Sequence, residues 1–231
     1  MAGPATSRFR GLCRECRVVL TLLGAFDAKE ESRVLSSHGR DLARLPLHPR
    51  LAHLALKAST LEDDGPSNAD TTVAELCALL EQERDVLQLQ EGNAKVSAAP
   101  RCADARTRLL ALKTRALPAC YRNIRPLPGQ CKQVLQSAAR LQRELPSAAK
   151  AVRIKNPGPF LALAYPERVA RRAKNNRFLL RDGTSCIVKD PMLQGEEFLA
   201  VGRMFRTNVV TLAAPLTAAE AAVYVLGDAL R

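Results

Sequence analysis

The cations that follow Pro166 are the residues of this sequence whose type and spacing best suit contact with a ligand. Arg168, Arg171 and Arg172 are three and four residues apart, a spacing that places them on one side of a helix. We therefore predict a helix that begins at Pro166, where proline removes no needed backbone donor. The charge continues into the next expected strand with Lys174, Arg177 and Arg181. Guanidinium and ammonium groups bind phosphates, although an ordinary solvated helix face has the same composition.

Positive charge is concentrated in the middle of the chain. Residues 101–181 hold 19 Lys or Arg and three acids, a net charge of +16, whereas the whole chain of 231 residues carries +12, which leaves −4 for the rest. Such one-sided charge is typical of proteins that bind a polyanion, whose counterions are released when Lys and Arg neutralise its phosphates. We therefore predict nucleic acid as the partner. A membrane surface is the alternative, but aromatic residues make up only 4% of the chain, and membrane-surface helices need an aromatic-rich face.

An apolar run precedes the cations and is predicted to form a strand. It contains Phe160, Leu161, Leu163 and Tyr165, and its length suits a short buried strand. Phe160 and Tyr165 are candidates for stacking on nucleobases. Alternating positions on an apolar strand belong more often to a hydrophobic core, and we favour that interpretation.

The histidines do not form a catalytic group with their neighbours. His48 has no carboxylate or cysteine near it in the sequence, so we expect a structural role. Ser36, Ser37 and His38 include a nucleophile and a base, but adjacent residues seldom face each other, and Ser37 is expected to cap a helix. We predict no catalytic residue.

Seven cysteines, an odd number without regular spacing, favour a reducing compartment. We expect the cytoplasm; an organelle is the alternative, because the Arg-rich stretch up to Arg17 could serve as a transit peptide. Cys13 and Cys16 form one C-x-x-C, but zinc needs a second pair of ligands, so both are expected on the buried side of a helix and no metal is predicted. No apolar run approaches the roughly 20 residues that cross a bilayer.

Helical periodicity dominates the first two thirds of the sequence. Apolar residues recur at helical spacing before Gly24 and after Pro49, and Thr72 with Glu75 has the spacing of a capping box. The expected helices cover 12–23, 37–45, 49–56, 72–84, 104–115 and 129–145, with a short two-stranded wing over 25–35 and a polar linker over 59–71. These elements predict a helical bundle.

The periodicity changes after Pro157. Short apolar runs are separated by turn signals such as Asp182-Gly183. The expected strands are 160–165, 177–181, 185–188, 197–201 and 208–213, followed by a helix over 217–226. They predict a small antiparallel barrel or meander, and hence an α+β fold.

Four blocks of sequence occur in a fixed order: GAFD at 24–27 followed by LSSHGRDLARLPLHPRLA at 35–52, AELCALLEQERDVL at 74–87 and GPFLALAYPERVARRAKNNRFLLRDG at 158–183. Together they resemble the region behind the motor of HrpB-type DEAH-box RNA helicases. LAYPERVARR is the most specific, and RTNVVTLAAPL at 206–216 is similar to the last barrel strand of that family. The resemblance covers nearly the whole chain.

The resemblance implies four regions. These are a partial winged helix and the start of a bundle over 1–58, a ratchet-like helical bundle over 59–156, an OB-like barrel over 157–216, and the start of a further extension over 217–231. In that family this region forms one wall of the RNA channel, which implies binding of single-stranded RNA and contact with RecA-like motor domains in cis or in trans. The residues predicted above from spacing, charge and aromatic character to bind nucleic acid are Tyr165, Arg168, Arg171, Arg172, Lys174, Arg177 and Arg181. A structural motif is predicted at Leu45, Pro46, His48, Pro49 and Arg50.

The motor of that family binds ATP and Mg²⁺, and its signatures do not occur in this sequence. There is no Gly-Lys dipeptide to build a phosphate-binding loop and no Asp-Glu-Ala-His to hold Mg²⁺. We therefore expect no bound cofactor and no ATP hydrolysis by the chain alone. The chain is expected to be a C-terminal part of a helicase; a freestanding basic RNA-binding or ribosome-associated protein is the alternative.

Overall fold

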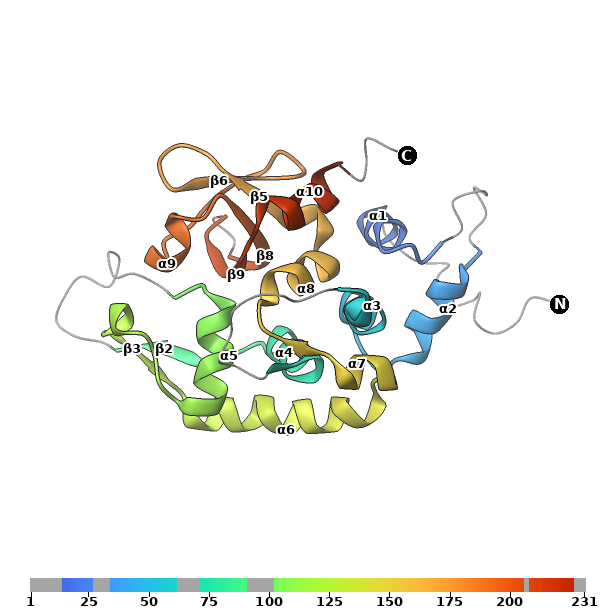
Figure 1. The fold of residues 1–231 in the computed structure, drawn as a ribbon, viewed down its shortest axis with the longest axis horizontal. Helices are drawn as coiled ribbons and strands as arrows, with labels where there is room; N and C mark the ends of the chain where they lie inside the picture. The colour runs from blue at the N-terminus through green and yellow to red at the C-terminus, as the bar shows by residue number, and fades with distance from the viewer. Residues whose placement is uncertain (1–13, 27–33, 62–70, 91–101, 206–207, 227–231) are drawn as a thin grey trace.

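The computed structural model describes residues 14–26, 34–61, 71–90, 102–205 and 208–226 (Figure 1). Helices make up most of the part before residue 165. They are α1 (Arg14–Leu22), α2 (Ser37–Arg44), α3 (Pro49–Lys57), α4 (Val73–Glu81), α5 (Ala105–Thr114), α6 (Pro128–Glu144), α7 (Ser147–Ala151) and α8 (Pro157–Ala164), with short 3₁₀ turns η2 (Ala58–Thr60) and η3 (Ala119–Tyr121). Two small antiparallel pairs join them, β1 (Thr71–Thr72) with β4 (Arg153–Ile154) and β2 (Leu87–Leu89) with β3 (Ile124–Pro126).

The helices begin where the sequence supplies caps. Thr72 and Glu75 form a reciprocal capping box at the start of α4, and the Asp104 side chain caps α5. The predicted capping box and the predicted start of a helix at Asp104 are both confirmed. At α2 the cap is Ser36, whose hydroxyl accepts from the Gly39 amide, so the prediction of Ser37 was one residue off. Gly24 ends the first helix at φ +68°, a left-handed conformation that costs glycine little.

The second part is a curled five-stranded antiparallel sheet with strand order β7-β6-β5-β8-β9. Its strands are β5 (Val169–Arg172), β6 (Arg177–Leu180), β7 (Ser185–Ile187), β8 (Phe198–Met204) and β9 (Val210–Leu216). The sheet nearly closes on itself, because Ile187, the last residue of β7, pairs with Val209, which directly precedes β9. The 3₁₀ turn η4 (Pro166–Arg168) precedes it, α9 (Pro191–Gln194) lies between β7 and β8, and α10 (Ala218–Leu226) follows as predicted.

This architecture agrees with the predicted helical bundle and small barrel, but it does not establish a winged helix. Of the predicted wing, the structure shows one bridge between Phe26 and Leu35; residues 27–33 lie outside the described ranges. None of the described helices is long and apolar enough to span a membrane.

The segment before the cations differs from the prediction. Residues 160–165 were expected to form a strand, and instead Pro157–Ala164 is the helix α8. Two prolines stand in its first turn, where no backbone donor is lost, and Asn156 caps it. The helix packs on α3 at one side and on β8 and β9 at the other, so it is apolar all round and shows no helical period in sequence.

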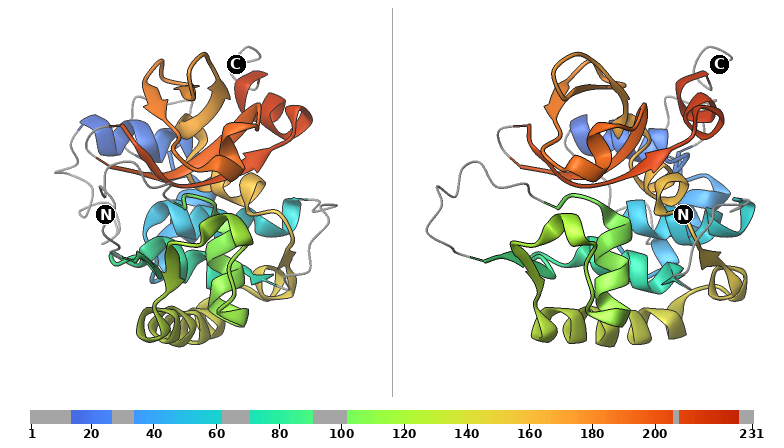
Figure 2. Two further views of the ribbon diagram at one scale, coloured as in Figure 1. Left: turned by 90° about the vertical axis from the view of Figure 1, so that its left-hand side faces the viewer. Right: turned by 60° about the vertical axis from the view of Figure 1, so that its left-hand side comes forward.

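The hydrophobic core is continuous across bundle and barrel. One cluster of buried residues runs from Leu51 in α3 through Phe160 in α8 to Leu216 in β9. A side chain on Gly158 would overlap the Pro215 carbonyl, so glycine allows α8 to lie directly on β9. A second cluster, with Phe178 and Leu199, fills the barrel. Figures 1 and 2 show the barrel and α6 at opposite ends of the molecule, with α8 between them.

Candidate nucleic-acid interface

The predicted cationic helix is wrong: the residues after Pro166 form the turn η4 and then the strand β5. β5 pairs with β6, with Arg171 opposite Leu179 and Arg172 opposite Phe178. Side chains alternate along a strand, so Arg171 and Arg172 point to opposite faces of the sheet and do not share one helical face. Arg172 donates to the Gly195 carbonyl at 2.9 Å.

The hairpin between β5 and β6 carries three of the predicted cations on its exposed surface. Arg171, Lys174 and Arg177 are all exposed. Asn175 and Asn176 make the turn with φ values of 58° and 57°, a left-handed conformation that asparagine tolerates. Within the described ranges no acid lies within ion-pair distance of these three cations, which we call the hairpin cations.

Tyr165 and Arg168, also predicted to bind nucleic acid, are engaged within the protein. The guanidinium groups of Arg50 and Arg168 lie over the Tyr165 ring, 4.9 and 5.0 Å from its centroid. Arg168 also donates to the Gly202 carbonyl at 3.1 Å. The ring packs against the continuous core, and burial is the main cause that raises the pKa of its hydroxyl. An alanine at Arg168 would therefore remove structural contacts.

Arg50 joins the two sequence blocks that carry the resemblance. Its guanidinium donates to both carboxylate oxygens of Glu167, at 3.1 and 2.7 Å, and to the Ala164 carbonyl at 2.9 Å. The LPLHPRLA block of α3 thus binds the LAYPERVARR block directly. Arg50 was predicted as part of a structural motif, but its partner was not; the signal was an arginine among apolar residues and one glutamate in a strongly basic segment.

The rest of the LPLHPRLA motif builds the start of α3. The Nδ1 atom of His48 accepts from the Arg50 amide at 3.3 Å, so His48 is the N-cap residue and Pro49 follows in the first turn. Leu45 and Leu47 are partly buried against the core, whereas Pro46 is exposed. Burial, and then the charge of Arg50, lower the pKa of His48. Arg181, the last predicted cation, is half-buried just after β6, where its amide donates to the Val169 carbonyl.

His38 and His53 form a hydrogen-bonded pair that fastens the first three helices. Nε2 of His38 lies 2.8 Å from Nδ1 of His53, and His53 also hydrogen-bonds the backbone of Leu23. When His53 is neutral and donates to the Leu23 backbone, its Nδ1 atom accepts from Nε2 of His38. Burial is the main cause that lowers the pKa of His53 to about 4, followed by the charges of His38 and Lys57.

This pair predicts a pH dependence of stability. The unfolded chain binds a proton on His53 below about pH 6.5, but the folded chain binds it only near pH 4, so we expect the free energy of unfolding to fall between these values by up to about 3 kcal/mol. Urea denaturation at several pH values measures the slope. His53→Asn should show a shallower slope than the unchanged chain; identical slopes would contradict the assignment.

A buried carboxylate connects the barrel to the bundle. Asp190, fully buried before α9, accepts from the amides of Ala103 and Asp104 at 2.6 and 2.9 Å and from the Tyr121 hydroxyl at 2.7 Å. It also accepts from the Met192 amide at 2.9 Å. Asp190 is not among the residues predicted from the sequence, although its place before a Pro-initiated helix turn is a capping signal.

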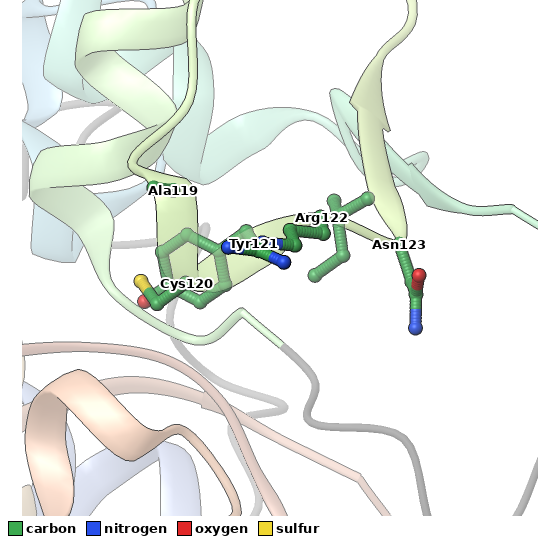
Figure 3. Close-up of a pocket in the computed structure, with 6 residues that line it drawn as sticks. Ala119, Cys120, Tyr121, Arg122 and Asn123 are labelled. Atoms are coloured by element: carbon green, nitrogen blue, oxygen red, sulfur yellow. The ribbon is translucent and has the colours of Figure 1, made fainter.

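One cleft of about 490 Å³ lies beside this network (Figure 3). It is lined by residues 119–124, including Cys120, Tyr121 and Arg122. The Tyr121 hydroxyl is committed to Asp190, and burial is the main cause that raises its pKa. The lining therefore provides no base to activate Cys120. In the described part of the chain no three residues are grouped as metal ligands. Cys16 is exposed, against the prediction, and Cys13 lies outside the described residues.

The arrangement of bundle, connecting helix and barrel has counterparts among solved structures. No protein-family model matches the sequence, and no curated protein matches it. The structure is similar to two crystal structures of HrpB from Escherichia coli, described as a DExH-box NTPase and as a DEAH/RHA helicase. The TM-score is 0.50 for both, with 23% and 22% sequence identity over 90% and 88% of this chain.

The chain shares its fold with part of HrpB. The resemblance that the sequence blocks indicated is thus confirmed at the level of fold. The match covers 21% of each HrpB chain, so this chain spans about a fifth of their length.

Proposed function

We propose that the chain is an accessory region of a DEAH-type RNA helicase that lines the RNA channel and binds single-stranded RNA without sequence preference. The shared fold with part of HrpB and the order of the sequence blocks support this assignment. ATP and Mg²⁺ would be bound by RecA-like motor domains, which are the second proposed partner. The barrel is of the OB-like type, whose second and third strands and adjoining loops bind oligonucleotides in other proteins.

The hairpin cations are the observation that supports binding most directly. Arg171, Lys174 and Arg177 lie together on the hairpin that joins the first two barrel strands, exposed and without acidic partners in the described chain. Some other cations of the basic segment are paired with acids of the chain, such as Arg108 with Asp85 at 2.6 Å. Unpaired cations attract phosphates, and phosphate contacts carry no sequence information, which accounts for binding without preference.

A second group of cations provides a matched control. Lys132, Arg140 and Arg143 are exposed on α6, which lies at the end of the molecule opposite the barrel (Figures 1 and 2). Neutralising either trio removes the same net charge. A difference between the two variants therefore reports position, because the long-range effect of net charge is matched.

We expect the variant with Arg171→Gln, Lys174→Gln and Arg177→Gln to bind a single-stranded oligoadenylate RNA roughly 100-fold more weakly at about 0.1 M salt. Each phosphate contact on a single strand contributes about fivefold there through counterion release. The α6 variant should change affinity much less. Fluorescence anisotropy measures both. Equal losses in the two variants would mean that binding is not located at the hairpin.

The alternative is a freestanding basic RNA-binding protein, which, unlike a helicase accessory region, needs no motor domains. Separately expressed RecA-like domains of a DEAH-type helicase should bind the chain if the helicase proposal holds. RNA binding at the hairpin without any binding of motor domains would favour the freestanding protein.

A further inference from the structure

Four residues lie side by side across the outer surface of the barrel. Arg177 of β6 pairs with Ile187 of β7, and Ile187 bridges to Val209. The Phe205 amide donates to the Val209 carbonyl at 2.9 Å, which adds Phe205 to the row. Arg177, one of the hairpin cations, and Phe205, which directly follows β8, are therefore joined through β7, although they are distant in sequence.

The side chains of this row point outward. Each is flanked along the chain by residues that face the barrel interior: Phe178, Cys186, Val188 and Val210 are buried, and Met204 packs against the same interior cluster. Alternation along a strand therefore directs Arg177, Ile187 and Phe205 to the outer surface. The side chain of Phe205 is 62% exposed.

A second outward row lies beside the first. Arg171 is opposite Leu179, and Leu179 is opposite Ser185. Leu179 is 50% exposed. We call the two rows together the barrel platform; each row has a cation at one end and apolar groups beside it, and neither row contains an acidic residue. Exposed apolar surface next to unpaired cations is complementary to a single strand, which has apolar base faces and anionic phosphates.

Phe205 is the aromatic residue of the described chain best placed for such a ligand. The Tyr165 ring is covered by two guanidinium groups, and Phe160 and Phe178 are fully buried. Three strand spacings separate Arg177 from Phe205, a distance of about 15 Å, so one strand of RNA could contact both.

We propose that Phe205 stacks on an unpaired nucleobase of a strand whose phosphates are bound by the hairpin cations. This inference rests on the proposed binding of single-stranded RNA and deepens it, because it names the residue that contacts a base. Bases paired in a duplex are stacked on one another and leave no free face for the ring. Stacking is tolerant of sequence, since every base has an aromatic face.

Three RNA probes separate base contacts from phosphate contacts. They are a single-stranded oligoadenylate, an abasic ribose-phosphate oligomer of the same length, and a duplex. Phe205→Ala should bind oligoadenylate about 10-fold more weakly, within the range for loss of one stacked base, and should bind the other two probes unchanged. Phe205→Trp should restore affinity. Val223→Ala, which trims another exposed apolar residue on α10, is the matched control and should have no effect.

The outcomes for the two proposals are distinct. If neutralising the hairpin cations weakens binding but Phe205→Ala does not, the stacking inference is overturned and the proposed function stands. If Phe205→Ala weakens binding to the abasic oligomer as much as to oligoadenylate, the ring does not act on bases and the inference is again wrong. If the unchanged protein binds none of the probes, the proposed function itself fails, and the stacking inference fails with it.

Discussion

Arg50→Ala should destabilise the folded chain by about 3 kcal/mol, a decrease of roughly 6–12 °C in the melting midpoint. The side chain of Arg50 is 10% exposed, and removing it leaves the Glu167 carboxylate without its bidentate partner. It also leaves the Ala164 carbonyl without this donor. Loss of one member of a buried ion pair is costly because the other charge stays desolvated.

The matched control for this change is Arg44→Ala. Arg44 forms an ion pair with Asp41 at 3.0 Å, but both side chains are exposed, at 79% and 48%. Surface pairs contribute roughly 0.2–1 kcal/mol. The nitrogen–oxygen distances of the two ion pairs are similar, so we attribute the expected difference in destabilisation to the burial of Arg50. Similar melting midpoints for Arg44→Ala and Arg50→Ala would show that Arg50 does not hold α3 to the segment before β5.

Asp190→Ala should cost about 4 kcal/mol or more and should loosen the barrel from the bundle. The amides of Ala103 and Asp104 and the Tyr121 hydroxyl would lose a buried acceptor. Each unsatisfied buried donor costs about 1–3 kcal/mol. Urea denaturation measures the total, and hydrogen exchange at the two amides reports the local effect.

Two variants give the scale for Asp190. Tyr121→Phe removes one of its hydrogen bonds and should cost about 1 kcal/mol. Asp182→Ala removes an exposed carboxylate that accepts from the Thr184 amide at 2.8 Å and should cost less than about 1 kcal/mol. If the amides of Ala103 and Asp104 keep their protection in Asp190→Ala, the carboxylate does not connect the two parts.

Local signals predicted the helices well, and long-range contacts explain what they missed. Thr72 and Asp104 start helices because capping depends on residues a few positions apart. The sequence predicts a strand at the α8 segment because a short apolar run has the same pattern in a buried strand and in a helix enclosed on all sides. The helix is enclosed by tertiary contacts with α3, β8 and β9, which the local sequence pattern does not show.

In the candidate interface, too, local sequence patterns identified some residues, whereas long-range contacts determine how they come together. The concentration of positive charge predicted Arg171, Lys174 and Arg177 as binding residues. They share one surface because β5 pairs with β6, and the spacing of the residues in the sequence does not predict that pairing. Arg50 and Glu167 are 117 positions apart, so no local pattern joins them. Phe205 reaches the platform only through bridges across β7 and was not predicted.

The salt dependence of RNA affinity tests the central claim most directly. The logarithm of the affinity for single-stranded oligoadenylate should fall linearly with the logarithm of salt concentration, with a slope of roughly 0.7 for each phosphate engaged. Neutralising Arg171, Lys174 and Arg177 should reduce that slope by about 2, while neutralising Lys132, Arg140 and Arg143 should leave it nearly unchanged. An unchanged slope in the hairpin variant, with a reduced slope in the α6 variant, would place the RNA at the opposite end of the molecule and contradict the account.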